Sequence, residues 1–258
     1  MLRPSLVIAA PLVVFASLAV APLAAADEET PVIKLASPLG VAQGTTTKVT
    51  LRGLKLDNAQ GVECSDGKST AKIIGQGNAN VPNQQNAQKI GDRQVEIELT
   101  IPEDAPAGEL GLVVVTPAGK SEPYRLLVGG EFPLVAEQEP NDGFRQAQAI
   151  QPSQIVEGSI HGDRNVDCYV VEGQAGQSLT IEVLAERRGS GLDALLSVYN
   201  ERAQWLASHD DMTETRDARL EFTSPAAGKY FIVVQDAHDL GGPAHPYRLI
   251  VRPGRAGN

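Results

Sequence analysis

The sequence has few aromatic residues, only two cysteines and no recognisable catalytic motif. Phe, Tyr and Trp make up 4% of the 258 residues. No pair of histidines has the HExxH spacing of a zinc protease, and no serine lies in the GxSxG turn of an α/β-hydrolase. These absences predict that the protein is not an enzyme.

The two cysteines, Cys64 and Cys168, lie far apart in the chain and have no CxxC or histidine neighbour. They therefore do not indicate a zinc or redox site. We interpret both as small, mostly buried side chains. An interdomain disulfide is the alternative, because secreted proteins occupy an oxidising compartment.

Positive charge is also scarce. The chain has 22 Lys and Arg residues against 32 Asp and Glu residues, for a net charge of −10. Nucleic acids and anionic membranes require clustered basic side chains. We therefore expect neither as a partner.

Long apolar runs are absent except at the N-terminus. There Arg3 precedes an apolar run over residues 6–20, and three alanines at 24–26 precede Asp27. This pattern predicts a secretory signal peptide over residues 1–26 and a secreted mature chain, located extracellularly, in the periplasm or at the cell surface. No later run could span a bilayer, so we expect no stable membrane insertion of the mature chain.

Residues 31–130 consist of short β-type runs separated by Gly, Pro and Asn. Thr47, Val49 and Leu51 alternate with polar residues, as in a strand with one buried face. Evenly spaced strands predict an immunoglobulin-like β-sandwich, and the polar residues 75–89 are expected to form a loop outside any core. The turn segments Ser37-Pro38-Leu39-Gly40 and Thr116-Pro117-Ala118-Gly119 resemble those of TIG/IPT modules.

Residues 131–253 predict a second all-β domain. A short helical turn is expected after residue 142, followed by eight strands whose spacing favours a jelly-roll-like sandwich. The predicted fold is thus all-β, with two tandem β-sandwich domains after the signal peptide.

Oxygen donors are concentrated between the two domains, in Glu137-Gln138-Glu139-Pro140-Asn141-Asp142. Residues two apart in an extended segment point the same way, so Glu137 and Glu139 are expected to share a side. Carboxylates gathered without a basic residue repel one another unless a hard cation lies between them. The segment therefore predicts a calcium site, with a solvated acidic linker as the alternative.

The second domain resembles bacterial pre-peptidase C-terminal domains, which are similar to the collagen-binding domains of clostridial collagenases. The resemblance rests on the 137–142 segment and on three further segments in the same order, at 158–163, 167–171 and 226–234. It implies a β-sandwich of the kind that trails secreted proteases. It also implies calcium ligands at Glu137, Glu139, Asn141, Asp142 and Asp167, with Asp163 as an additional candidate.

Other polar and aromatic residues leave further interpretations open. A second cation site is an alternative to ordinary turn capping for four acidic residues, Asp193, Asp210, Asp211 and Asp217. His209 beside Asp210 is the nearest approach to a catalytic pair, although we expect the histidines to be surface or loop residues: His161, His209, His238 and His245. Four aromatic residues could form a sugar-binding platform or belong to the core: Tyr199, Trp205, Tyr230 and Tyr247.

Together these features predict a secreted, non-enzymatic binding or surface module that has a structural calcium site and recognises an extracellular protein or polysaccharide. The alternatives are a structural component of an envelope or surface assembly, and an accessory domain of a secreted protease system. A hydrolase built on His209, Asp210 and Asp211 is a third possibility, and it would require those side chains to converge in a pocket.

Overall fold

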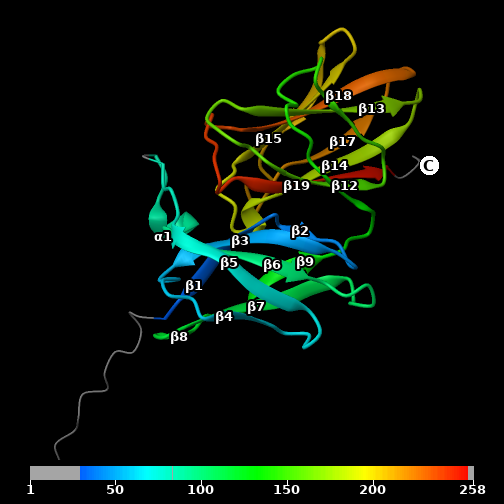
Figure 1. Ribbon diagram of the computed structural model, residues 1–258. Coiled ribbons are helices and arrows are strands. Elements are labelled where there is room, and N and C mark those ends of the chain that lie inside the picture. Colours follow the sequence, from blue (N-terminus) through cyan, green and yellow to red (C-terminus); the bar gives the residue numbers. More distant parts are fainter. Residues whose placement is uncertain (1–29, 83, 255–258) are drawn as a thin grey trace, which may run out of the picture.

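The computed structural model describes residues 30–254 except residue 83, so the predicted signal peptide lies outside the described residues. Two β-sandwiches follow one another along the chain and pack against each other (Figure 1). The predicted all-β fold with tandem sandwiches is confirmed. No helix in the described part of the chain is long and apolar enough to cross a membrane.

The first sandwich packs a four-stranded sheet of order β1-β3-β6-β5 against a sheet of order β2-β9-β7-β4, in which β8 pairs with β7. Its strands are β1 (Val32–Ser37), β2 (Gly40–Val41), β3 (Thr46–Leu54), β4 (Gly61–Cys64), β5 (Thr70–Asn78), β6 (Arg93–Thr100), β7 (Gly108–Thr116), β8 (Gly119–Lys120) and β9 (Tyr124–Val128). The inward-facing apolar residues of both sheets, such as Leu51, Ile97 and Leu112, form one core with no solvent exposure.

The second sandwich consists of two five-stranded sheets, of orders β10-β12-β19-β14-β17 and β11-β13-β18-β15-β16. Its strands are β10 (Leu134–Ala136), β11 (Gln148–Ala149), β12 (Gln154–Ser159), β13 (Val166–Gly173), β14 (Ser178–Leu184), β15 (Ala194–Asn200), β16 (Trp205–His209), β17 (Arg219–Thr223), β18 (Gly228–Asp236) and β19 (Pro246–Pro253). A 3₁₀ turn, η1 (Glu186–Arg188), follows β14.

Two local predictions were only partly right. The helical turn expected after residue 142 is a single hydrogen-bonded turn, closed by Gln146 N–H and Gly143 O, and the chain then enters β11. Residues 75–89 are not one loop, because residues 75–78 belong to β5 and a short helix, α1 (Ala87–Ile90), begins within the stretch. Val81 in this stretch and Ile90 just after it, which is 2% exposed, pack in a cluster with Ala244 of the second domain.

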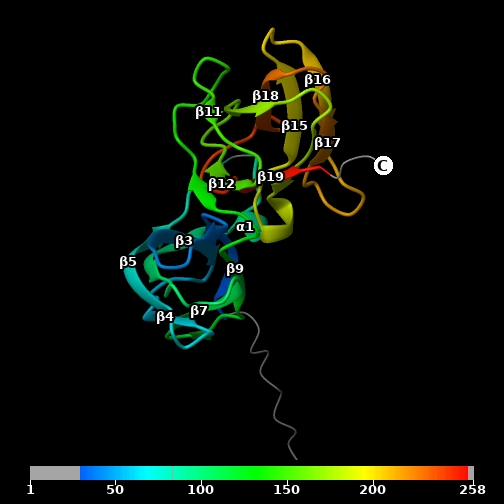
Figure 2. The same ribbon diagram turned by 90° about the vertical axis from the view of Figure 1, so that its right-hand side faces the viewer.

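Buried Arg52 organises the stretch between β5 and β6. Its guanidinium donates to the carbonyl oxygens of Ile90, Asn80 and Gly91 at 3.2, 2.8 and 3.1 Å. Apolar side chains from the first domain, Leu35, Leu39 and Ile90, then pack with Ala244 of the second. This cluster is an interdomain core. Figure 2 shows the two sandwiches meeting near α1.

His245 lies beside that core, in the loop before β19, and is fully buried. The prediction that the histidines are surface or loop residues therefore holds for its position, although its burial was not expected. Its Nε2 lies 3.4 Å from Gln85 Nε2 of the first domain. Burial lowers the pKa of His245 from its ordinary value of 6.5, and Asp236 offsets part of that effect. The imidazole is therefore held neutral at the domain interface.

A buried ion pair within the second domain contacts the first domain through hydrogen bonds. Arg248 Nε donates to Glu157 Oε1 at 2.6 Å, and the two side chains are 5% and 9% exposed. Gly40 N–H donates to Glu157 Oε2, and Arg248 Nη1 donates to Gly129 O, each at 3.2 Å. Burial raises the pKa of Glu157 to about 7, although Arg248 opposes the rise. The orientation of the two sandwiches is thus fixed by polar as well as apolar contacts.

Candidate functional site

The acidic segment 137–142 begins where β10 ends and runs along the edge of the second sandwich. β10 pairs in parallel with β12, and Glu137 N–H continues this pairing by donating to Glu157 O at 3.0 Å. This backbone contact directs the Glu137 side chain towards the interior between β12, β13 and β19. The local extended conformation expected from the sequence is what positions the site.

The carboxylate of Glu137 is buried and held by four donors. Oε1 accepts hydrogen bonds from Tyr169 OH at 2.7 Å, Tyr247 OH at 2.9 Å and Asn141 Nδ2 at 3.1 Å. Oε2 accepts one from Ser159 N–H at 2.9 Å. The side chain is only 6% exposed, so these donors compensate for the loss of its hydration.

Asp167 lies next to Glu137 and has no solvent exposure. Tyr247 OH lies 2.7 Å from its Oδ2, whereas its Oδ1 has no hydrogen-bond partner. Burial, followed by the charge of Glu137, raises the pKa of Asp167 to about 9. The buried carboxyl groups of Glu137 and Asp167 are therefore in contact with each other, and no basic side chain lies between them.

Asn141 contributes a second unpartnered oxygen. Its side chain is fully buried and its Nδ2 donates to Glu137, but its Oδ1 accepts no hydrogen bond from a described residue. An unsatisfied buried acceptor costs about 1–3 kcal/mol. Asn141 Oδ1 and Asp167 Oδ1 are thus two oxygens beside a buried carboxylate that a hard cation would satisfy, and the residues present fit such an ion.

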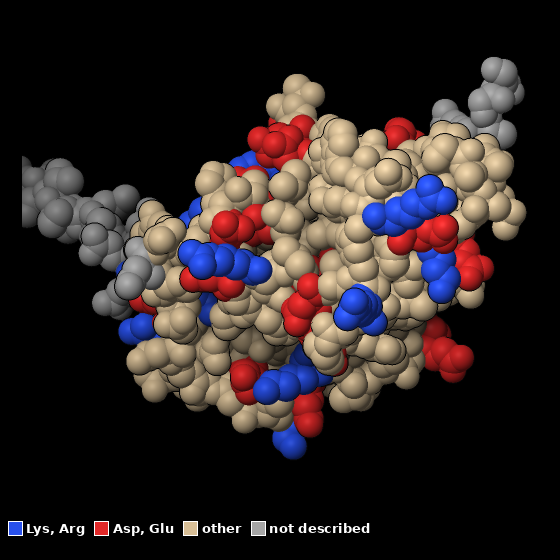
Figure 3. All heavy atoms as spheres, turned by 90° about the horizontal axis from the view of Figure 1, so that it is seen from above, with Lys and Arg blue, Asp and Glu red and all other residues tan. Residues whose placement is uncertain are grey.

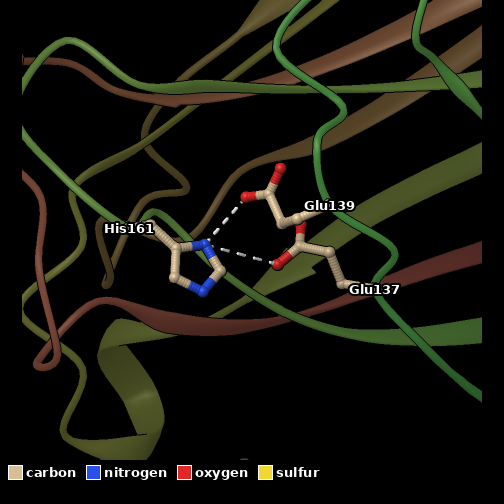
Figure 4. Close-up of side chains that lie close together, drawn as sticks. All are labelled: Glu137, Glu139 and His161. Atoms are coloured by element: carbon tan, nitrogen blue, oxygen red, sulfur yellow. Dashed lines mark ion pairs between the residues drawn. The ribbon is translucent and has the colours of Figure 1, made fainter.

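Glu139 and His161 form the outer part of the site. Glu139 Oε1 lies 2.8 Å from His161 Nδ1, and Glu137 Oε2 lies 4.0 Å from the same nitrogen. Figure 4 shows the two carboxylates and the imidazole pointing towards one another, and one ligand atom from each lies within 4.8 Å of the others. The sequence prediction that Glu137 and Glu139 share a side agrees with this placement.

His161 was missed as a site residue from the sequence. It lies two residues after the end of β12, outside the strand. Ser159 contacts Glu137 through its backbone N–H, so side-chain alternation along β12 gave no signal for His161.

The remaining two predicted ligands lie further out. Asp142 is exposed, and its Oδ1 accepts a hydrogen bond from Asn165 Nδ2 at 2.6 Å. Asp163 is exposed in the loop before β13. The structure thus brings together Glu137, Glu139, Asn141 and Asp167 and leaves Asp142 and Asp163 at the periphery.

Two of the four aspartates considered for a second cation site have basic partners. Asp217 is fully buried, accepts two backbone N–H groups through Oδ1 and pairs with Arg187 through Oδ2 at 2.5 Å. Asp193 pairs with Arg216 at 3.0 Å. Asp210 and Asp211 are exposed. Within residues 30–254, the only cluster of three or more potential metal-binding side chains is the one at Glu137, Glu139 and His161.

The residues of the hydrolase alternative do not converge. Nδ1 of His209 accepts a hydrogen bond from Arg219 N–H at 3.4 Å, and Asp210 Oδ1 accepts one from the Asp211 N–H. Neither contact orients an imidazole against a nucleophile.

The two cysteines are free thiols, with Cys64 half-buried and Cys168 buried, so they do not form the alternative disulfide.

Aromatic side chains gather on the outer face of the sheet that contains β15, β16 and β18. Tyr199 is directly opposite Phe231 on one side and Trp205 on the other. The ring of Phe144 stacks on Phe231 with centroids 4.5 Å apart and lies 5.3 Å from Tyr199. Trp205 is 60% exposed. We call these four residues the aromatic face.

The other two candidate platform residues belong to the core. Tyr230 is 3% exposed and Tyr247 is fully buried. The face of the molecule that is seen from above carries interspersed basic and acidic side chains, without a continuous basic patch (Figure 3).

Comparison with known proteins confirms the predicted family resemblance of the second domain. Residues 165–236 match the family described as the bacterial pre-peptidase C-terminal domain. No curated protein matches the chain. The matched residues include β13, which contains Asp167, and β18, which contains Phe231 of the aromatic face.

Solved structures with a similar fold include the pre-peptidase C-terminal domain of a Bacillus anthracis collagenase, at 19% identity and a TM-score of 0.34, covering 45% of this chain and all of that one. A second is Aeromonas hydrophila PliG, a periplasmic inhibitor of g-type lysozyme, at 22% identity and a TM-score of 0.32, covering 48% of this chain and 98% of that one. A third is Bacteroides ovatus SGBP-B in complex with a mixed-linkage heptasaccharide, at 12% identity and a TM-score of 0.25, covering 77% of this chain and 72% of that one.

Proposed function

We propose that the protein is a secreted, non-enzymatic module that binds an extracellular protein or polysaccharide through its second sandwich, which a structural calcium ion stabilises. The match of residues 165–236 to an accessory domain family supports a binding role. The observation that carries the calcium proposal is the pair of buried, unpartnered oxygens, Asn141 Oδ1 and Asp167 Oδ1, beside the carboxylate of Glu137.

In this proposal four residues hold the ion: Glu137, Glu139, Asn141 and Asp167. Calcium would supply the positive charge that two adjacent buried carboxyl groups require. Tyr169 and Tyr247 keep the Glu137 carboxylate in place through their hydroxyl groups. Because the backbone N–H of Glu137 also continues the β10–β12 pairing, the same residue fixes the segment that follows β10.

The ligand surface is proposed to be the aromatic face. Trp205 exposes most of its ring beside Tyr199, on the outside of a rigid sheet. Flat aromatic surfaces bind sugar rings and the apolar side chains of proteins with little loss of conformational entropy. The face lies on β15, β16 and β18, away from the interdomain contacts, and so it stays accessible when the two sandwiches are docked.

A retention experiment tests the binding proposal. The mature protein is incubated with insoluble collagen and with insoluble glycans, and the Trp205→Ala variant is compared with Ile74→Ala, which removes another exposed apolar side chain from the first domain. We expect retention on one matrix and about a tenfold loss for Trp205→Ala alone, the loss expected when one contact worth 1.4 kcal/mol is removed. Equal retention of both variants would contradict the aromatic face as the ligand surface.

A structural role in an envelope or surface assembly is the second candidate. It is favoured by the buried Glu157–Arg248 pair and the interdomain core, which make the two sandwiches a stiff spacer. The same experiment separates the candidates, because a purely structural component is expected to show no retention on collagen or on any of the glycans.

A further inference from the structure

The turn that follows Asn141 carries one ring of the aromatic face. Asn141 is one of the four residues proposed to hold calcium, and Phe144 belongs to the proposed ligand surface. Only Asp142 and Gly143 separate the two residues in the chain. The proposed cation site and the proposed ligand surface therefore share one short segment.

Backbone hydrogen bonds fix the course of this turn. The carbonyl oxygen of Asn141 accepts the N–H groups of Gly143 at 2.8 Å and of Cys168, on β13, at 2.9 Å. The carbonyl oxygen of Gly143 accepts the N–H group of Gln146 at 2.9 Å, which closes a β-turn with Phe144 at its second position. Because each of these contacts starts from the one before it, the position of Asn141 sets the position of the Phe144 ring.

Phe144 is the one ring of the aromatic face that does not come from a strand. It stacks on Phe231 with centroids 4.5 Å apart and planes inclined by 22°, and its centroid lies 5.3 Å from that of Tyr199. Tyr199 is in turn directly opposite Trp205, and residues in such a pair are close neighbours on one face of a sheet. A continuous path thus leads from Asn141 to Trp205.

The side chain at the start of this path favours a bound cation. Asn141 is fully buried, and its Nδ2 donates to Glu137 Oε1 at 3.1 Å. Its Oδ1 and the nearby Asp167 Oδ1 have no hydrogen-bond partner among the described residues. An ion that binds these oxygens stabilises the arrangement in which Asn141 points into the site, relative to every other arrangement of the segment.

We propose that occupancy of the cation site controls the aromatic face through Phe144, so that the protein binds its ligand more tightly when calcium is bound. This inference rests on the proposed calcium site and ligand surface, and it adds the coupling between them. Phe144 is a positioning residue, whose ring packs on Phe231 and supports Tyr199 when Asn141 is held by the ion. Such coupling is reciprocal, because the ligand must raise the affinity for calcium by the same factor.

The fluorescence of Trp205 tests the coupling with calcium as the only probe, since the sequence contains a single tryptophan. The metal-free mature protein is titrated with calcium, and both the heat and the tryptophan emission are measured. We expect an emission change that saturates at the same calcium concentration as the heat. Asp167→Asn is expected to lose both signals.

Two variants of the turn separate the coupling from calcium binding itself. Phe144→Ala is expected to keep the heat of calcium binding and to lose the emission change. Arg145→Ala alters the next residue of the same turn, whose side chain is exposed, and it is expected to behave like the wild type. Circular dichroism verifies that each variant folds.

Retention on insoluble collagen and on insoluble glycans, with calcium and with a chelator, extends the test to the ligand. We expect the wild type to bind at least about fivefold more tightly with calcium, and Phe144→Ala to bind equally in both conditions. Retention of the wild type that does not depend on calcium would overturn the proposal.

The calorimetric and fluorescence results distinguish failure of the coupling from failure of the calcium site. Heat without an emission change in the wild type would overturn the coupling and leave the calcium site intact. An unaltered emission change in Phe144→Ala would overturn Phe144 as the connection. Absence of both signals in the wild type would contradict the calcium site and, with it, the coupling.

Discussion

The hydroxyl group of Tyr247 lies 2.7 Å from Oδ2 of Asp167, inside a sandwich where neither side chain is exposed to solvent. The same hydroxyl lies 2.9 Å from Glu137 Oε1. A single phenol therefore spans two buried carboxyl groups that belong to segments far apart in the sequence. This contact is the centre of the proposed calcium site.

Replacing this hydroxyl should destabilise the metal-free protein. Tyr247→Phe removes the single hydroxyl proton that one of the two carboxyl groups accepts at a time, and we expect the free energy of unfolding to fall by about 1–3 kcal/mol. Saturating calcium should reduce that loss, because the ion would satisfy the same carboxyl groups. Tyr230→Phe is the control, since its hydroxyl donates to Ala226 O outside the site. Denaturant unfolding with and without calcium measures the difference, and an equal response of both variants to calcium would argue against the site.

Removing one partner of the buried Glu157–Arg248 ion pair, which lies at the domain interface, should be costly. Arg248→Met leaves the Glu157 carboxyl buried without its cation, which typically costs about 3–5 kcal/mol. The exposed pair Lys120–Glu63, with a separation of 2.7 Å, provides the contrast, and Lys120→Met should change stability little. The double variant Glu157→Gln, Arg248→Met should recover part of the loss. Thermal unfolding measures all three, and similar stability of Arg248→Met and Lys120→Met would show that the pair contributes nothing to docking.

The buried His245 should make stability depend on pH. Burial lowers its pKa below the ordinary value of 6.5, so the unfolded chain takes up a proton first as the pH falls. Stability is therefore expected to decrease from about pH 6.5 downward until the folded imidazole also becomes protonated. Glu157 has a raised pKa and gives a slope of opposite sign, so the measurement is the difference between the wild type and His245→Gln at each pH. A difference that stays constant from pH 7 to about pH 5 would contradict this assignment.

His161 should influence which cation the site prefers. Imidazole nitrogen is a good ligand for manganese and zinc, whereas calcium prefers oxygen. We expect His161→Gln to weaken binding of manganese and to leave binding of calcium nearly unchanged. His238→Gln serves as the control, because His238 is exposed and lies near Asp193, in the other group of aspartates. Calorimetric titrations with each metal provide the comparison, and equal manganese affinity of wild type and His161→Gln would exclude a role for the imidazole.

The sequence was informative where function depends on local chemistry. Alternating polar and apolar residues predicted strands such as β3 and β14, and the concentration of oxygen donors at Glu137 and Glu139 predicted the candidate site. Asp167 was found through its family resemblance, since a single aspartate at the start of a strand carries no signal of its own.

The features that were missed depend on contacts between distant segments. The burial of Ile90 and His245 comes from the docking of one sandwich on the other, and Tyr247 reaches Glu137 across a separation of 110 residues. No periodicity within a segment encodes such contacts. The aromatic face was also ambiguous, because Tyr199 and Tyr230 look alike in the sequence although one lies on the outside of a sheet and the other inside it.

The most direct test of the calcium proposal is a calorimetric titration of the metal-free protein with calcium, followed by thermal unfolding. The wild type is expected to bind and to gain about 2.7 kcal/mol of stability at a calcium concentration one hundred times the Kd, which raises Tm by roughly 5–10 °C. Asp167→Asn keeps the shape of the side chain but removes its charge, and it should abolish this response, whereas Asp210→Asn should retain it. Neither heat nor a shift in Tm for the wild type would contradict the account.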